Sequence, residues 1–292
     1  MSQDLFREMK EKYPSFSKGQ KMIADYMTKH YDKAAFMTAA KLGQTVGVSE
    51  STVVRFVTEL GFDSYHDMKK SLRQLTRSRL TAIQRVKITE ELVQDADPLT
   101  KVLQNDILNI TETLSQITPQ DFEAAIGQIV GAKNVYVLGV RNAGTLADFL
   151  AFNLNLILDG VHRVDAAGSA EVYEQILRIG QGDVMIGISF PRYSHRTVQA
   201  LRFARDRGAE VLAITDSSSS PLAPYADKLL LARSDMAGFV DSLTAPMSLI
   251  NALIVGVTMK RQEAVEQRFG ELEAIWEEYQ VYDKVDGEEK NG

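Results

Sequence analysis

The chain has 292 residues, a formal net charge of −6, and 45% hydrophobic and 25% charged residues, which is typical of a globular protein about two domains long. The absence of cysteine excludes disulfide scaffolds, thiol nucleophiles and Cys-ligated zinc or iron–sulfur centres. The four histidines show no metal-ligand spacing, and we expect neither a metal nor a cofactor. The charged amino terminus is unlike a signal peptide, and the apolar run 243–259 contains too many polar residues to span a bilayer. We expect a cytoplasmic protein without membrane contact.

The charge is unevenly distributed along the chain. Residues 1–87 contain 16 Lys and Arg against 9 Asp and Glu, whereas residues 88–292 contain 17 against 30. This asymmetry predicts that the first part binds a polyanion, with a solvated basic face as the alternative.

The first 97 residues show the pattern of short helices. Capping hydroxyls mark the predicted helix starts at Ser17, Thr38, Ser49 and Ser64. The helix after Ser49 is predicted to run to Leu60 and to end at Gly61. Residues 69–97 are polar and predicted to be helical, and Asp97-Pro98 is typical of a linker.

The rest of the chain changes from helices to alternating strands and helices. Two helices are predicted over 98–130, the second beginning at Thr118-Pro119. Short apolar runs then indicate buried parallel strands at 135–138, 161–164, 184–188, 211–214 and 229–231. The first four are followed by helical patterns, beginning with 145–158. A helix over 242–265 closes the domain, and Asp241-Ser242 at its start is either its cap or a pocket wall, the cap being favoured.

These patterns predict an all-α helix-turn-helix bundle followed by an α/β domain. The second domain is expected to be a doubly wound, five-stranded parallel sheet with flavodoxin-like strand order. The predicted limits are 1–80 for the bundle, 81–117 for a helical linker, 118–280 for the sheet domain and 281–292 for a frayed tail.

The segment 42–56 has the features of a DNA-binding helix-turn-helix. Gly43 allows two helices to approach closely, and Gly47 suits the left-handed backbone of a turn. On the following helix the apolar residues face inward at helical spacing, so polar side chains are left to face outward near its start. The predicted DNA-binding residues are Ser49, Glu50, Ser51, Thr52 and Arg55.

Basic residues follow this motif without an acidic residue between Asp67 and Glu90. They are Lys69, Lys70, Arg73, Arg77, Arg79, Arg85 and Lys87. Contact with DNA phosphates is one interpretation, for which we select Lys69, Lys70 and Arg73; a solvated helix is the other.

Two loops of the second domain are suited to an anionic ligand. Small residues after the first strand let backbone N–H groups at a helix start approach an anion. The loop after the third strand carries hydroxyls and arginines where open α/β sheets bind ligands, although Ser194 is also a plain N-cap. The predicted ligand-binding residues are Gly139, Arg141, Asn142, Ala143, Ser189, Arg192, Tyr193, Ser194 and Arg196. The first loop is no full dinucleotide fingerprint, which argues against NAD.

With both halves in view, the chain resembles the RpiR/MurR family of bacterial transcriptional regulators. The resemblance rests on Gly47-Val48-Ser49, Thr52-Val53-Val54-Arg55-Phe56 and Leu60-Gly61-Phe62 in the first half. The second half is similar to the SIS (sugar isomerase) domain, which in that family binds phosphosugars and commonly drives assembly. The resemblance implies a double-stranded DNA operator, a small anionic metabolite such as a sugar phosphate, and a homodimer or homotetramer.

The SIS-like loops depart from the usual family pattern. Ala143 stands where serine is usual and Arg141 where glycine is usual. The pattern Ser-x-Ser-Gly-x-Thr is replaced by residues 189–194, which keep only the first and last hydroxyls. Arg141 or Arg192 would then replace hydroxyl contacts by charge-assisted ones.

Two other functions compete with a ligand-responsive regulator. A phosphosugar isomerase with an appended helical domain needs a positioned base, for which Glu171 and His195 are the candidates. A purely structural oligomerisation protein leaves the polar face of the third helix unexplained. We therefore expect a regulator and no enzyme.

Overall fold

The computed structural model describes residues 5–77, 80–93, 97–165, 168–236 and 238–282. The chain forms two compact units. Unit 1 comprises Met1–Thr111 together with Phe190–Tyr193 and Ser234–Ser242, and unit 2 comprises Glu112–Ser189, Ser194–Arg233 and Leu243–Gly292. Unit 1 therefore includes residues 81–111 of the predicted linker. Of the predicted tail, residues 283–292 lie outside the described residues.

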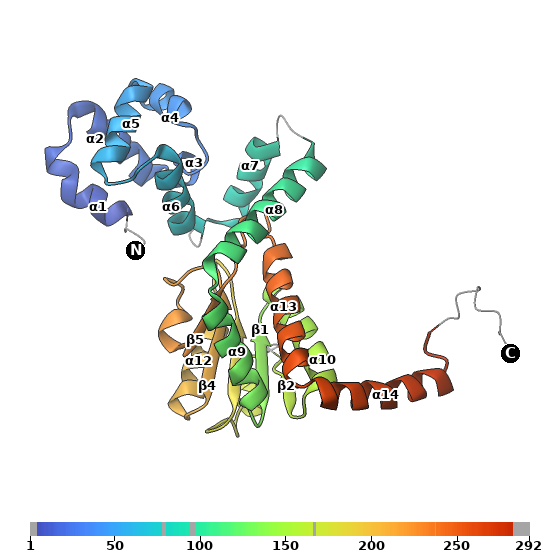
Figure 1. Ribbon diagram of the computed structural model, residues 1–292. Helices are drawn as coiled ribbons and strands as arrows, with labels where there is room; N and C mark the ends of the chain where they lie inside the picture. The colour runs from blue at the N-terminus through green and yellow to red at the C-terminus, as the bar shows by residue number, and fades with distance from the viewer. Residues whose placement is uncertain (1–4, 78–79, 94–96, 166–167, 237, 283–292) are drawn as a thin grey trace. The chain divides into compact units, whose positions relative to one another are not determined.

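Unit 1 is helical, as predicted (Figure 1). Its elements are α1 (Leu5–Lys12), η1 (Tyr13–Ser15), α2 (Lys18–Lys29), α3 (Tyr31–Ala34), α4 (Ala39–Val46), α5 (Glu50–Glu59), α6 (Tyr65–Arg77), α7 (Ala82–Val93) and the first part of α8 (Pro98–Gln116). The predicted caps are present: Ser17 forms a complete capping box with Gln20, and Thr38 and Ser49 accept backbone hydrogen bonds. A shared apolar core that includes Leu5, Ile23 and Phe56 holds the bundle together.

The predictions for residues 69–98 need correction. The helical stretch is two helices, because α6 ends at Arg77 and α7 begins at Ala82. Asp97-Pro98 is a helix start rather than a linker: the Asp97 carboxylate accepts hydrogen bonds from Thr100 N and Oγ1, each at 2.9 Å. A proline at the first helical position loses no hydrogen bond, so the same dipeptide suits a helix start. The short α1 and α3 lie outside the predicted set.

Unit 2 contains the predicted parallel sheet. Its strands are β1 (Val135–Gly139), β2 (Val161–Arg163), β3 (Val184–Ile188), β4 (Glu210–Thr215) and β5 (Lys228–Leu231). They pair in parallel in the order β2-β1-β3-β4-β5, which is the flavodoxin-like order expected from the sequence. The order reverses between β1 and β3, where Gly139 is the register partner of Ile188.

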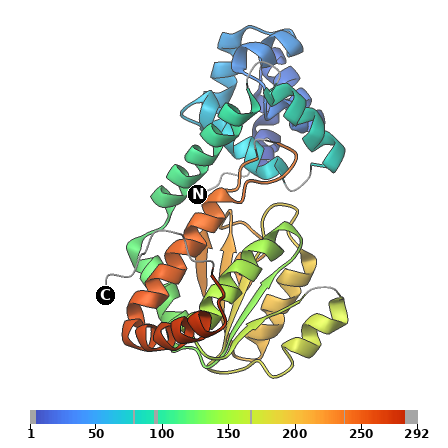
Figure 2. The same ribbon diagram turned by 90° about the vertical axis from the view of Figure 1, so that its right-hand side faces the viewer.

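Helices cover both faces of this sheet (Figure 2). They are α9 (Pro119–Gly131), α10 (Asn142–Ile157), α11 (Ser169–Gln175), α12 (His195–Asp206), α13 (Thr244–Lys260) and α14 (Gln262–Glu278), with the 3-10 turn η2 (Ala223–Tyr225). One layer is formed by α9, α13 and α10, which pack side by side, while α12 packs on β3 and β4 beside α11. The single closing helix predicted over 242–265 is instead α13 followed by α14.

The predicted capping role of Asp241-Ser242 is wrong. The N-cap of α13 is Leu243, with no side-chain cap hydrogen bond. Asp241 instead pairs with Arg85 at 3.1 Å, and Ser242 Oγ donates to Asp106 Oδ1 at 2.6 Å. These partners lie 136 or more residues away in the sequence, so local spacing gave no sign of them.

Within the described ranges, no helix is long and apolar enough to cross a membrane. Nor does this part of the chain bring three or more His, Cys, Asp or Glu side chains together in a way that could hold a metal ion.

Candidate functional site

The turn between α4 and α5 has the geometry that the sequence predicts. Gly47 has φ +80°, and its N–H and that of Val48 both donate to Gly43 O at 2.9 Å. A Cβ at Gly43 would lie 2.9 Å from Val48 O, so glycine is needed where the turn passes over α4. Ser49 Oγ then accepts from Thr52 N at 3.3 Å and caps α5. The start of α5 is therefore positioned by local hydrogen bonds of the turn and of its cap.

The start of α5 presents polar side chains to solvent. Ser49, Glu50, Ser51 and Arg55 are exposed, whereas Thr52 is half-buried. Thr52 Cγ2 lies only 3.3 Å from where a Cβ at Gly19 of α2 would stand, so its methyl group faces the bundle. Arg55 Nε donates to Ser51 O at 3.3 Å, one helical turn back. The exposed face thus combines a guanidinium, two hydroxyls and a carboxylate.

Two further residues of α5 share this face and were missed by the sequence analysis. Val54 is 48% exposed, and Thr58 is exposed with its Oγ1 donating to Val54 O. They follow Ser51 by three and seven residues, which is the spacing of one helical face. An exposed valine at this place can contact a thymine methyl group. The helical periodicity was the available signal, because neither residue falls on the inward-facing apolar side of α5.

The basic residues of α6 are not equivalent. Arg73 is directed into the bundle, because its Nε donates to Ala35 O at 2.9 Å and its guanidinium carbon lies 5.0 Å from the centroid of the Phe36 ring. Lys69 and Lys70 are half-buried. Burial, and then repulsion from Arg73 and Lys101, lowers the pKa of Lys69 to about 8. Farther along, Arg85 is buried, Lys87 is exposed, and Arg79 lies outside the described residues.

In unit 2, the first predicted ligand loop follows β1 at the point where the strand order reverses. Open parallel sheets bind ligands at this place, outside the carboxyl ends of the strands. A Cβ at Gly139 would lie 2.1 Å from Ala143 O, so only glycine lets the start of α10 come this close to the strand. Ala143 is buried and Asn142 is exposed.

Arg141 forms the turn into α10 in an unusual backbone conformation. It has φ 58° and ψ −126°, a region that favours glycine, and its side chain makes no capping hydrogen bond. Its O accepts from Gly144 N at 2.8 Å. The 16-residue α10 therefore begins without a side-chain cap, with its positive dipole end beside an exposed arginine.

The second loop uses its hydroxyls within the protein. Ser189 Oγ is buried and accepts from Ser194 N at 3.0 Å, and Ser194 Oγ caps α12 by accepting from Thr197 N at 3.4 Å. Thr197 Oγ1 is fully buried yet makes no hydrogen bond within the described residues. Most buried hydroxyls are hydrogen-bonded, so this one marks a place where a partner is missing.

The remaining residues of this loop are divided between the two units. Arg192 and Tyr193 belong to unit 1; Arg192 is exposed with φ 63°, and Tyr193 is half-buried. Arg196 is exposed on the first turn of α12. The structure thus brings Ser189 and Ser194 together by a hydrogen bond, whereas Arg141 and Arg192 belong to different units.

A third loop at the same sheet edge was missed. The polar residues Thr215, Asp216 and Ser217 follow β4 and are all buried. A polar run directly after a buried strand was the available signal. The two candidate bases for isomerisation, Glu171 and His195, are both exposed at the starts of α11 and α12.

Comparison with known proteins identifies the family. Residues 3–78 match the model of the helix-turn-helix domain of the rpiR family, and residues 128–256 match the SIS domain. The crystal structure of an RpiR transcription factor from Sphaerobacter thermophilus (sugar isomerase domain) is 32% identical, with a TM-score of 0.58; the match covers 60% of this chain and 97% of that one. The chain belongs to the RpiR family.

Other relatives of this RpiR-type regulator extend over both of its domains. An HTH-type transcriptional regulator of Haemophilus influenzae is 28% identical over 75% of this chain and 76% of its own. The Vibrio vulnificus NanR protein, solved in complex with ManNAc-6P, is 19% identical with a TM-score of 0.59, and covers 96% of this chain and all of that one. The latter likeness supports the fold.

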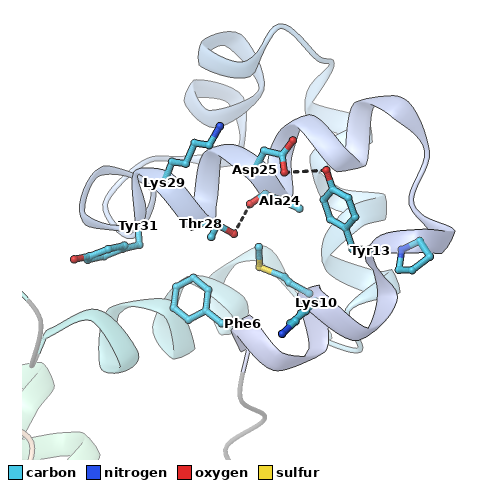
Figure 3. Close-up of a pocket in the computed structure, with 10 residues that line it drawn as sticks. Phe6, Lys10, Tyr13, Ala24, Asp25, Thr28, Lys29 and Tyr31 are labelled. Carbon is cyan, nitrogen blue, oxygen red and sulfur yellow. Dashed lines mark hydrogen bonds between the residues drawn. The ribbon is translucent and has the colours of Figure 1, made fainter.

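The helix-turn-helix unit also carries an open groove of 580 Å³ (Figure 3). Phe6 and Met9 of α1 line it together with Ala24 and Tyr31, and Tyr13 donates to Asp25 Oδ1 at 2.9 Å. None of the predicted DNA-binding or ligand-binding residues of this RpiR-type regulator lines the groove. The groove is therefore separate from both predicted sites.

Proposed function

We propose that this transcriptional regulator reads a DNA operator with the exposed face of α5 and senses a sugar phosphate, or a related anionic metabolite, with the loops after β1 and β3. The observation that carries the DNA part is the capped start of α5, which exposes Ser51 and Arg55 beyond the Gly47 turn. This is how a recognition helix presents side chains to base edges in the major groove.

The proposed DNA interface has a reading part and a positioning part. Ser49, Glu50, Ser51, Thr52 and Arg55 read bases, with Val54 and Thr58 added from the structure. Lys69 and Lys70 contribute sequence-independent attraction to phosphates. Arg73 is omitted because its guanidinium is held by Ala35 O and the Phe36 ring.

Three features support an anionic effector in unit 2. The loop after β1 lies at the switch point of the sheet, α10 begins without a side-chain cap, and the exposed Arg141 stands at that start. The unpartnered Thr197 Oγ1 adds a buried group that lacks an acceptor or donor. NanR, which has the same fold, was solved with a phosphosugar, and we extend that ligand class to this chain.

We assign the chain no catalytic step and expect it to act as a homodimer or homotetramer. Large apolar side chains are exposed on α10 and α13, which pack against each other in unit 2; they are Phe149, Phe152, Val255 and Met259. A second copy on this surface would provide two recognition helices. Two recognition helices related by a two-fold axis read DNA half-sites about 34 Å apart.

Fluorescence anisotropy with the DNA upstream of the protein's own gene tests this function. We expect specific binding to a pseudo-palindromic fragment, and an affinity loss of about 10³-fold between 50 and 200 mM salt if the complex neutralises about six or more phosphates. A panel of ManNAc-6P, arabinose 5-phosphate and glucose 6-phosphate is then added, and one of them should change the affinity about fivefold or more.

Operator reading, the absence of catalysis and the sugar-phosphate effector are each contradicted by a different experimental result. Equal affinity for the upstream fragment and for unrelated DNA at all salt concentrations contradicts operator reading. Turnover of a panel compound at an enzyme-like rate favours the isomerase instead. An unchanged affinity and melting temperature with the whole panel contradicts the sugar-phosphate effector.

Operator affinity is also expected to depend on pH through Lys69. Its pKa in the free protein is about 8, and a neighbouring phosphate stabilises the charged ammonium, so the complex takes up a proton. Affinity is therefore full below pH 8 and falls as the pH rises, by up to about tenfold at pH 9. Anisotropy titrations at pH 7, 8 and 9 and constant ionic strength measure this dependence.

The variant Lys69→Arg keeps its charge throughout this range and should bind equally well at the three pH values. The matched control is Lys33→Arg, an exposed lysine on α3, which should keep the wild-type dependence. If Lys69→Arg and wild type lose affinity in parallel, Lys69 does not contact the DNA.

A further inference from the structure

The segment Ser234–Ser242, which we call the strap, is grouped with unit 1 although it connects β5 and α13 of unit 2. Along the chain it lies more than a hundred residues beyond α8, yet it makes specific polar contacts with α7 and α8.

The first attachment holds the strap by its backbone. Asn109 Nδ2 donates to Asp235 O at 2.9 Å, while Asp235 N donates to Asn109 Oδ1 at 3.2 Å. Asn105 Nδ2 donates to the same Asp235 O at 2.7 Å. Asn109 is 3% exposed, so its amide is committed to this pairing. These bonds fix both the position and the direction of the strap on α8.

The second attachment is a buried ion pair. Arg85 Nη1 lies 3.1 Å from Asp241 Oδ2, and the side chains are 6% and 14% exposed. Ser242 Oγ adds a hydrogen bond to Asp106 Oδ1 at 2.6 Å. Such a pair depends on close geometry, because losing either partner leaves a buried charge uncompensated. The strap is therefore attached to α7 and α8 in one specific arrangement.

The strap also contacts the DNA-binding bundle. Met236 and Leu80 form a small buried cluster against which Phe36 packs. Phe36 lies under the Arg73 guanidinium, and Arg73 in turn bonds Ala35 O. Burial lowers the pKa of Arg73, and the negative charge of Asp235 opposes that shift. Side-chain contacts thus run from the strap to α6, which packs directly on α5.

The other end of the strap begins at the sheet edge. All five strands are parallel, so the carboxyl end of β5 lies at the same edge as those of β1 and β3. The two residues between β5 and the strap are anchored in unit 2: Ala232 N donates to Thr215 O and Arg233 N to Thr113 Oγ1, both at 2.8 Å. The strap therefore starts from the edge that carries the proposed effector loops.

We propose that the strap is the relay through which effector binding at the sheet edge changes the DNA-binding bundle. It has an attached state, held by Asp235 and Asp241, and a released state in which Met236 leaves Leu80 and Phe36. An effector that favours one state shifts the population of the other. The relay rests on the proposed function, because it connects the proposed effector loops to the proposed DNA-reading face.

A reversible disulfide tests the relay in this cysteine-free chain. A Cβ at Gly238 of the strap would lie 3.9 Å from Thr89 Cγ2 of α7, so Thr89→Cys with Gly238→Cys places the two cysteine side chains in van der Waals contact, from which a disulfide can form. Operator affinity is measured with and without ManNAc-6P, arabinose 5-phosphate and glucose 6-phosphate, before and after oxidation with diamide. The single-cysteine variants are the controls.

In the reduced protein we expect one sugar phosphate to change operator affinity about fivefold or more, as in the wild type. In the oxidised protein the strap cannot leave α7. The sugar phosphate should then change operator affinity by no more than about twofold, and dithiothreitol should restore the full response. A full response in the oxidised protein overturns the relay while leaving the proposed function intact. A wild type that binds no operator overturns the proposed function instead.

Hydrogen exchange tests the strap without DNA or effector. Asp241→Asn breaks the ion pair, and we expect exchange to become about tenfold faster in the strap and also in α7 and around Asn105–Asn109, as in a cooperative opening unit. The control Asp159→Asn removes an ion pair with Arg268 outside the strap, so the exchange rates of these segments should not change. Faster exchange confined to the strap overturns the relay, because the strap would then open without affecting the helices.

Discussion

Replacing Arg55 by alanine is expected to weaken operator binding by about 5- to 150-fold, since a bidentate arginine–guanine contact contributes about 1–3 kcal/mol. Arg55 is exposed one helical turn beyond Ser51, and in the free protein its Nε bonds only the Ser51 carbonyl among the described contacts. Removing it should leave the α5 core intact, because Val53, Phe56 and Val57 make that core. Anisotropy titrations and a thermal melt measure the two effects.

The matched control is Arg7→Ala. Arg7 is an exposed arginine of α1 in an i,i+4 pair with Glu11, and such surface pairs contribute about 0–1 kcal/mol to stability. It should bind the operator nearly as well as the wild type. If Arg55→Ala loses no more affinity than Arg7→Ala, the face of α5 assigned to base reading is wrong. Loss of selectivity at a single base pair of the operator would identify the base that Arg55 contacts.

The helix-turn-helix was predictable because its determinants are local. A capping hydroxyl at Ser49 and a left-handed Gly47 each act over only a few residues. The strands were predictable for a related reason: apolar residues buried on both faces leave a continuous pattern. Thr52 shows the limit of prediction from local sequence, because its partial burial depends on the approach of Gly19 from another helix.

Local spacing was least informative where a polar residue had two possible partners. Arg73 follows Lys69 at the spacing of one exposed helix face, yet the Phe36 ring and Ala35 O draw it inward. Asp241 stands where a cap would stand, yet a buried arginine 156 residues away takes its carboxylate. In both cases a charge-assisted tertiary contact is stronger than the local alternative. Single-sequence spacing cannot show such a partner.

The backbone conformation of the two loop arginines could not be predicted from the sequence either. Arg141 and Arg192 replace residues that are usually glycine in SIS domains, and both keep a positive φ, of 58° and 63°. The fold therefore imposes the glycine conformation even where the side chain disfavours it. Strain of about 1–3 kcal/mol persists in proteins mainly at functional sites. The strain at Arg141 consequently supports a binding role for its guanidinium.

Arg141→Gly is expected to stabilise the protein while weakening effector binding. Glycine relieves about 1–3 kcal/mol of backbone strain, and ordering its more flexible backbone costs about 0.5–1 kcal/mol. Because the first energy is larger, the melting temperature should rise by roughly 2–4 °C. Losing a charge-assisted hydrogen bond of about 1.5–3 kcal/mol should weaken sugar-phosphate binding by roughly 10- to 150-fold. Calorimetry measures the first effect, and titration with the panel that includes ManNAc-6P measures the second.

Gln280→Gly is the matched control for strain. Gln280 has φ 51°, lies just after α14 and is exposed, so glycine should relieve strain there without touching the effector loops. A rise in melting temperature for both variants, with a binding loss for Arg141→Gly alone, separates backbone strain from anion binding. If Arg141→Gly melts lower than the wild type, the arginine stabilises its own loop. If its sugar-phosphate affinity is unchanged, the anion is held by the α10 start without the guanidinium.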